Sequence, residues 1–184
     1  MKNKNYLYGL LLYGFIAGFT SPVSAEIRQC DKEFISSDDS RIVYMGRISR
    51  SIPHIVRFTY PGVSILANFE GTSLQMKAKP GSGAFMVEVD DELPYRINFA
   101  ENDSIQTLAE GLPEGIHRIR IMYAIEGYEL KPAFKGFYLD KGCRLDEAPV
   151  LPERRIEFIG NSITCGYGVE SENPSDPFTY ETEN

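Results

Sequence analysis

The chain has 184 residues, a formal net charge of −7 and 42% hydrophobic residues. This length allows one domain, or one domain and part of a second. The acidic balance, without a basic patch, argues against nucleic acid as a partner.

The first 25 residues have the pattern of a secretory signal. Lys2 and Lys4 give a basic start, residues 7–19 are mostly apolar, and small residues precede a cleavage position after Ala25. A membrane anchor is the alternative, but this apolar run is shorter than the ~20 residues that a spanning helix needs. We therefore expect export to the periplasm or the extracellular space after cleavage near Ala25, without a stable membrane anchor.

Three cysteines bear on the redox state of the chain: Cys30, Cys143 and Cys165. An odd number in an exported protein leaves at least one thiol unpaired. Cys30 could pair with Cys143 across the two ends of the first domain, and three reduced, buried thiols are the alternative. The spacing of the cysteines matches no metal site, and we expect no metal or other cofactor.

Between residues 41 and 140 the sequence reads as many short strands. Apolar and polar residues alternate over residues 63–69 and 74–78, and the turn Gly71-Thr72 between these runs predicts a hairpin. The other predicted strands are residues 41–48, 84–89, 93–99, 104–109, 119–125 and 133–139. Regular short strands without helical spacing predict a mainly β fold, a β-sandwich, for the first domain, residues 26–140.

After the predicted sandwich the pattern changes. Residues 141–154 contain two prolines, a glycine and several charges, which is typical of a linker at a domain boundary. Residues 155–184 then read as a strand, a turn and the start of a helix, which is α/β character. Their acidic end, residues 170–184, reads as a surface loop with Phe178 and Tyr180 as its anchors.

Ser162 is the candidate nucleophile. The apolar residues 156–159 predict a strand, the turn Gly160-Asn161-Ser162 follows at once, and residues 163–168 could start a helix. A serine on a sharp turn between a strand and a helix exposes its hydroxyl, while nearby backbone N–H groups face an oxyanion formed there. We interpret Ser162 as a nucleophile. An ordinary turn with an incidental serine is the alternative.

The run from Gly160 to Gly168 resembles the first signature block of the SGNH, or GDSL-type, hydrolases, in which the serine stands in a Gly-Asp-Ser-x-Thr-x-Gly pattern. The departure is Asn161, where the pattern has aspartate. Asparagine keeps the hydrogen-bonding shape and loses the charge. The positions that the resemblance assigns to support of the serine are Gly160, Asn161, Thr164 and Gly166.

Several runs in fixed order extend the resemblance over the chain from about Arg41 to Asn184. They are Tyr60-Pro61-Gly62-Val63, Phe69-Glu70-Gly71-Thr72-Ser73-Leu74, Glu110-Gly111-Leu112, Gly115-Ile116-His117, Lys135-Gly136-Phe137 and Arg155-Ile156-Glu157-Phe158-Ile159-Gly160. Together they look like carbohydrate esterase family 2. This resemblance implies a jelly roll followed by an SGNH domain, here only its opening. It also implies an acetylated polysaccharide or oligosaccharide as substrate, such as acetylated xylan.

The resemblance places the catalytic histidine of the family in a later Asp-x-x-His block that this sequence does not contain. The resemblance implies that the N–H of Ser162 is one oxyanion donor, and that later blocks supply the other donors and an aromatic substrate platform. His117 follows Glu114 at the same acid-x-x-His spacing, but its alternation with Ile119 and Ile121 indicates a packed side chain. His54 reads as a surface or edge residue. A serine without a positioned base is a weak nucleophile, so we expect this chain alone to be inactive.

Two other roles for the sandwich remain open at this stage. It could be a non-catalytic carbohydrate-binding module, or a structural module that stiffens the esterase. The tyrosines available for sugar binding are Tyr60, Tyr95, Tyr123, Tyr128 and Tyr138. The acidic turn Asp90-Asp91-Glu92 could bind Ca²⁺, although such turns are usually only solvated.

Overall fold

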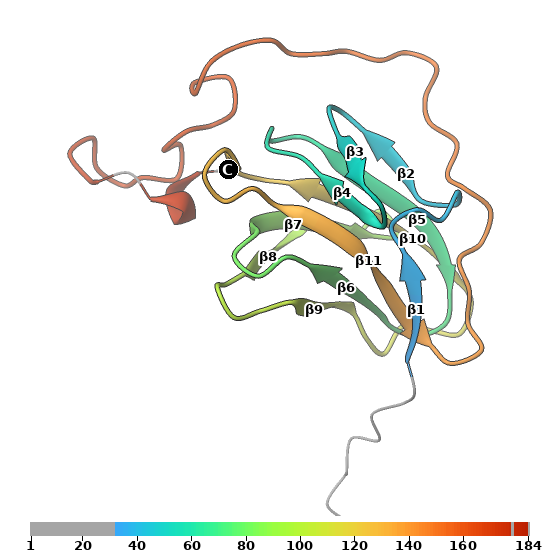
Figure 1. Ribbon diagram of the computed structural model, residues 1–184. Coiled ribbons are helices and arrows are strands. Elements are labelled where there is room, and N and C mark those ends of the chain that lie inside the picture. The colour runs from blue at the N-terminus through green and yellow to red at the C-terminus, as the bar shows by residue number, and fades with distance from the viewer. Residues whose placement is uncertain (1–31, 178, 184) are drawn as a thin grey trace, which may run out of the picture.

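The computed structural model describes residues 32–177 and 179–183, and these residues form two packed antiparallel sheets (Figure 1). The strands are β1 (Lys32–Ser36), β2 (Val43–Met45), β3 (Ser49–Ile52), β4 (Ile55–Arg57), β5 (Ser64–Glu70), β6 (Leu74–Ala78), β7 (Gly83–Val89), β8 (Tyr95–Phe99), β9 (Ile105–Ala109), β10 (Ile116–Tyr123) and β11 (Ala133–Asp140). One sheet has the order β3-β4-β11-β6-β9, with β1 also paired to β11, and the other has the order β2-β5-β10-β7-β8. The predicted mainly β sandwich is confirmed. The signal-like residues 1–25 and Cys30 lie outside the described residues.

Strict alternation of side chains explains why these strands pack as they do. Along β5, Ile65, Ala67 and Phe69 are almost completely buried, whereas the residues between them are half-buried. Along β10, Ile119, Ile121 and Tyr123 are buried, with exposed or half-buried residues between them. Successive side chains of a strand point to opposite faces, so one face of each sheet forms the core. Tyr123 therefore points into the core and is not available on the surface to bind a sugar.

Aromatic rings fill the space between the sheets. Phe85 of β7 lies in edge contact with Phe58, Phe99 and Tyr123, at centroid distances of 6.1, 5.7 and 5.1 Å. Phe134 and Phe137 of β11 form a second pair at 4.9 Å in the opposite sheet. Edge contacts of this kind add to the free energy gained by burial of the rings.

The predicted hairpin between residues 63–69 and 74–78 is wrong. Strand β5 pairs with β2 and β10, whereas β6 pairs with β11 and β9 in the other sheet. Gly71, at φ 120°, lies where the chain crosses between the sheets, and a Cβ there would lie 2.9 Å from Sγ of Cys143. Alternation therefore predicted the face of each strand correctly, but not its partner. The strands β1, β3 and β4 were not predicted, because β1 and β3 are short and largely polar and β4 has only three residues.

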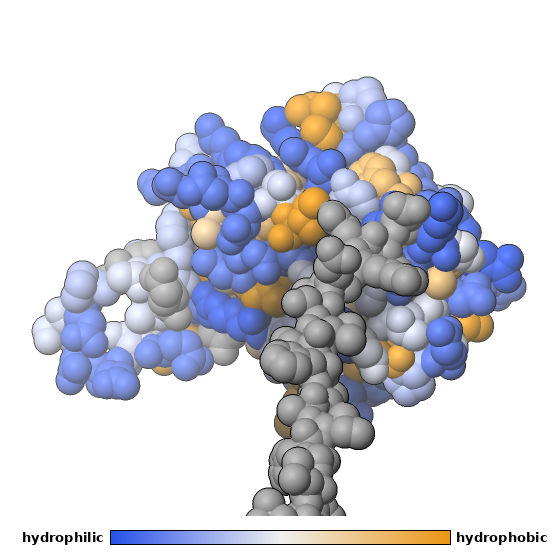
Figure 2. All heavy atoms as spheres, turned by 90° about the horizontal axis from the view of Figure 1, so that it is seen from below, coloured by the Kyte–Doolittle hydropathy of each residue, from blue (hydrophilic) through white to orange (hydrophobic). Residues whose placement is uncertain are grey.

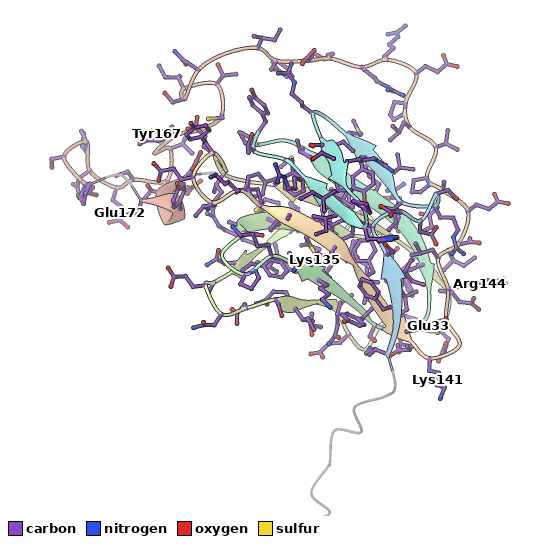
Figure 3. All side chains as sticks on the ribbon, viewed as in Figure 1. Glu33, Lys135, Lys141, Arg144, Tyr167 and Glu172 are labelled. Carbon is purple, nitrogen blue, oxygen red and sulfur yellow. The ribbon has the colours of Figure 1, made fainter. Side chains whose placement is uncertain are left out.

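The chain that follows β11 remains attached to the sandwich for a few residues. The carbonyl of Arg144 accepts a hydrogen bond from N–H of Glu70 at 2.9 Å. N–H of Asp146 donates to the backbone carbonyl of Asn68, also at 2.9 Å. Leu145, between them, is buried. Residues 152–161 are then exposed throughout. The connection that contains these residues runs along the outside of the sandwich, from the end near Lys141 and Arg144 to the end near Tyr167 (Figure 3).

Viewed from below, the molecule presents a mostly hydrophilic surface with small, separate apolar patches (Figure 2). The described residues contain one short 3₁₀ helix, η1 (Tyr180–Thr182). Within them, no helix has the length and apolar character that crossing a membrane requires.

We predict that Phe85→Ala lowers the free energy of unfolding by about 3–5 kcal/mol, because it leaves a cavity among the three rings that Phe85 contacts. Urea unfolding of the purified chain measures this loss. Tyr128→Ala is the matched control, because that ring is 82% exposed, and its effect should stay within about 0.5 kcal/mol. Equal effects of the two substitutions would contradict this account of the core.

Candidate active site

The serine block forms a set of tight turns around Ser162. The side-chain Oδ1 of Asn161 accepts a hydrogen bond from N–H of Ile163 at 3.1 Å. The backbone carbonyl of Asn161 accepts a second one from N–H of Thr164 at 3.0 Å. Gly160 lies against Thr164, with no room between them for a side chain at position 160. Asn161 therefore stabilises the turn through its amide oxygen, which the shape of an aspartate would also allow.

The flanks of the serine block differ from the prediction. Residues 156–159 form no strand, and Ile156, Phe158 and Ile159 are 80%, 80% and 90% exposed. The predicted helix start at residues 163–168 is a run of turns. Gly166 and Gly168 take φ values of 83° and 71°, which a right-handed helix does not contain. A buried parallel strand needs neighbours on both sides, and none of the strands in the described residues provides them.

Cys165 connects the serine block to the sandwich. Its thiol donates a hydrogen bond to Oε1 of Glu126 at 3.1 Å and also contacts the carbonyl of Ser162 at 3.2 Å. Burial, together with the hydrogen bond to Glu126, raises the pKa of this thiol to about 11, so it is protonated at neutral pH. Glu183 lies close by, and the ligand atoms of Glu126, Cys165 and Glu183 are all within 4.8 Å of one another. Such a set could hold a metal ion only after the thiol loses its proton.

The two cysteines in the described residues, Cys143 and Cys165, are free thiols. Cys30, the possible partner of Cys143, lies outside these residues. Burial, followed by the charge of Asp140, raises the pKa of the Cys143 thiol, which makes this side chain an unreactive, partly buried group.

His117 is a packed histidine with both ring nitrogens in use. Nδ1 donates to Oδ2 of Asp90 at 2.5 Å, Nε2 donates to the carbonyl of Pro113 at 2.8 Å, and the ring lies 5.5 Å from that of Phe69. Burial opposes protonation, but the hydrogen bonds to Asp90 and Pro113 outweigh it and raise the pKa of His117. A general base needs a free lone pair near its substrate, so this arrangement excludes His117 as the base for Ser162.

His54 and the acidic turn are also engaged in local contacts. His54 is exposed, and Nδ1 lies 2.6 Å from the carboxylate of Asp38. In the acidic turn, Asp90 binds His117 and N–H of Arg118, while Asp91 forms an ion pair with the Arg118 side chain. These contacts give the aspartates of the turn a structural role in the sandwich.

Comparison with known proteins assigns the sandwich to a family. Residues 44–149 match the family described as "Carbohydrate esterase 2 N-terminal". The chain therefore belongs to carbohydrate esterase family 2, of which it contains the N-terminal domain. The resemblance to carbohydrate esterase family 2 that the sequence indicated is confirmed.

Several known proteins are similar to this chain. An "Acetylxylan esterase / glucomannan deacetylase" from Cellvibrio japonicus is 34% identical over 157 residues, 85% of this chain and 42% of that protein. The solved structure of a family two carbohydrate esterase from Cellvibrio japonicus is 25% identical, with a TM-score of 0.72 over 83% of this chain and 46% of the other. A family two carbohydrate esterase from Clostridium thermocellum, solved with cellohexaose, is 35% identical, with a TM-score of 0.68 over 78% of this chain and 44% of the other. The chain spans less than half the length of each of these relatives.

We predict that the pair of Asp90 and His117 stabilises the fold most strongly in mildly acidic solution. The pKa of His117 is raised from 6.5, so its contribution is complete below pH 6.5 and is lost as the pH rises through the raised value. The pKa of Asp90 is lowered from 3.8, because hydrogen bonds to His117 and Arg118 outweigh the opposing effect of burial. The contribution of Asp90 to the free energy of unfolding is therefore complete above pH 3.8, and it is lost as the pH falls through the lowered pKa of Asp90.

Urea unfolding of the parent chain and of Asp90→Asn across this pH range tests the prediction. The parent should exceed Asp90→Asn in free energy of unfolding by the largest amount between pH 3.8 and pH 6.5. This difference should shrink at alkaline pH. Asp91→Asn, whose carboxylate pairs with Arg118 on the surface, should show no such dependence near neutral pH. The range from about pH 5 to about pH 9 covers two pH units on either side of neutral. If the difference in free energy of unfolding between the parent and Asp90→Asn stayed constant over this range, the stabilising role of the Asp90–His117 pair would be contradicted.

Proposed function

We propose that this chain is the N-terminal part of an exported serine esterase that removes acetyl groups from plant polysaccharides such as xylan. The observation that carries the proposal is the order of its parts: a carbohydrate esterase 2 N-terminal domain at residues 44–149, followed directly by the serine block at residues 160–168. The acetylxylan esterase similar to this chain supports the substrate class.

The proposed chemistry starts at Ser162. Its Oγ attacks the carbonyl carbon of the acetyl ester while a base takes its proton, and N–H of Ser162 donates to the oxyanion. The intermediate collapses, the sugar oxygen leaves with that proton, and the acetyl group remains on Ser162. Water then attacks the acetyl carbonyl carbon while the base takes one of its protons. The bond from that carbon to Oγ breaks, the base returns the proton to Ser162, and acetic acid leaves.

The base of this mechanism is proposed to be a histidine in the later Asp-x-x-His block of the family. The sequence has two histidines, and both are bound to other groups: His54 contacts Asp38, and His117 contacts Asp90 and Pro113. Secretion before catalysis is supported by the signal-like pattern of residues 1–25, and an extracellular or periplasmic site suits a polymeric substrate.

We predict that a fluorophosphonate probe modifies Ser162 in the protein as its native host exports it. Trypsin cleavage after Arg155 gives a peptide that begins at Ile156 and contains Ser162. Fragmentation of that peptide distinguishes Ser162 from Ser171. Label on Ser171 alone, or acetyl-ester turnover that survives Ser162→Ala, would refute the assigned nucleophile.

We predict that purified residues 26–184 do not hydrolyse 4-nitrophenyl acetate above the uncatalysed rate, because Ser162 has no base. Ser162→Ala should give the same rate as the parent, and so should the control Ser171→Ala. Turnover by the parent that Ser162→Ala abolishes would show that a base exists within these residues.

A further inference from the structure

We propose that the outer face of the six-stranded sheet carries a binding site for a neutral polysaccharide chain. The site is built on four side chains, Phe34, Tyr138, Gln75 and Thr107, which we term the aromatic row. The proposal deepens the proposed function, because it rests on a polysaccharide being the substrate. It uses a face of the sandwich that does not involve Ser162.

The register of four strands places these side chains in one line. Phe34 of β1 lies opposite Tyr138 of β11, Tyr138 lies opposite Gln75 of β6, and Gln75 lies opposite Thr107 of β9. Directly opposite residues share a face of the sheet. Gln75 follows buried Leu74, so this face is the outer one. Three strand spacings make the row about 14 Å long, which suits a linear polymer lying across the strands.

The two aromatic rings form one end of the row. Their centroids are 5.0 Å apart, and Phe34 is 43% exposed. The Phe34 ring lies directly on the backbone of Gly136, where a Cβ would come within 2.9 Å of Cζ. A large ring fixed on a sheet surface with an open side is suited to stack on the C–H face of a sugar ring, because burial of that apolar area is favourable.

Polar groups surround the rings and continue the row. Nε2 of Gln75 donates to Oγ1 of Thr107 at 3.3 Å, and Nζ of Lys77 donates to the hydroxyl of Tyr138 at 3.2 Å. Lys77 also lies over both rings, at 5.3 Å from Phe34 and 5.6 Å from Tyr138. Uncharged amide and hydroxyl groups beside an aromatic surface match the alternating C–H and O–H groups of a sugar.

The charges beside the row favour a neutral ligand. Lys32 is paired with Asp140 at 2.6 Å, and Ser73 donates to the same carboxylate at 2.7 Å. Phe34 lies on β1 and Tyr138 on β11. In Figure 3 these two strands can be found by the labels Glu33, on β1, and Lys135, on β11. A nucleic acid would need a series of cations along the row. Lys77 supplies one charge over the rings, whereas Lys32 is neutralised by Asp140 and the chain has a net charge of −7.

Isothermal titration with deacetylated gluco-, xylo- and manno-oligosaccharides tests the site on residues 26–184 carrying Ser162→Ala. At least one of these ligands should bind. Phe34→Ala should raise the Kd about tenfold, which corresponds to about 1.4 kcal/mol, and Gln75→Ala should raise it to a smaller extent.

Tyr60→Ala is the matched control and should leave the Kd unchanged. Tyr60 is also an exposed ring beneath a cation, Arg47 at 5.3 Å, but lies in the connection between β4 and β5. Urea unfolding of each variant establishes that the sandwich is intact.

Each outcome of this titration decides the proposal. Absence of binding to all three ligand classes would overturn it and leave the row as a surface for protein packing. Equal affinities of the parent, Phe34→Ala and Gln75→Ala would also overturn it. The esterase proposal is tested separately, because Ser162→Ala removes the nucleophile from every sample. Binding that depends on Phe34 would therefore support the row even if the exported protein hydrolyses no acetyl ester.

Discussion

The packing of aromatic rings between two antiparallel sheets is the interaction on which the rest of this molecule depends. Phe85 contacts rings from three other segments, and Phe134 and Phe137 pack on each other in the opposite sheet. The contacts of Phe85 with Phe58 and Tyr123 join segments that are distant in the sequence, because many strands that follow one another along the chain lie in different sheets. The outer faces of the sheets are thereby free to carry other functions.

The serine block receives no comparable support from the sandwich. The turn around Ser162 is held by Asn161 and Thr164, and Cys165 ties it to Glu126. The apolar side chains just before it are exposed instead of packed. Local sequence thus specifies the turn, whereas the proposed catalytic role of Ser162 would depend on packing and on a base that the described residues do not provide. This division is consistent with a chain that spans less than half of its relatives.

Much of the fold could be predicted from the sequence, because alternation over residues 63–69 and 119–123 reports directly which side chains are buried. The pairing of strands could not be predicted, because Gly71-Thr72 resembles a hairpin turn and gives no sign that the chain crosses to the other sheet. Polar strands such as β3 have no alternation to detect. In the site, the turn residues and the packed state of His117 followed from local pattern. The pair of His117 and Asp90 did not, because 27 residues separate them. The aromatic row was missed for the same reason, since Phe34 and Tyr138 meet only through strand register.

The central claim is that the sandwich has a packed core, whereas the apolar segment before Ser162 lacks packing partners among the residues that the structure describes. Hydrogen exchange measured by mass spectrometry on residues 26–184 tests it most directly. The account predicts strong protection of backbone amides in β5, β10 and β11, and exchange close to the unprotected rate at residues 155–161. Protection of residues 156–159 as strong as that of β5 would mean that this segment is a packed strand, and would contradict the account.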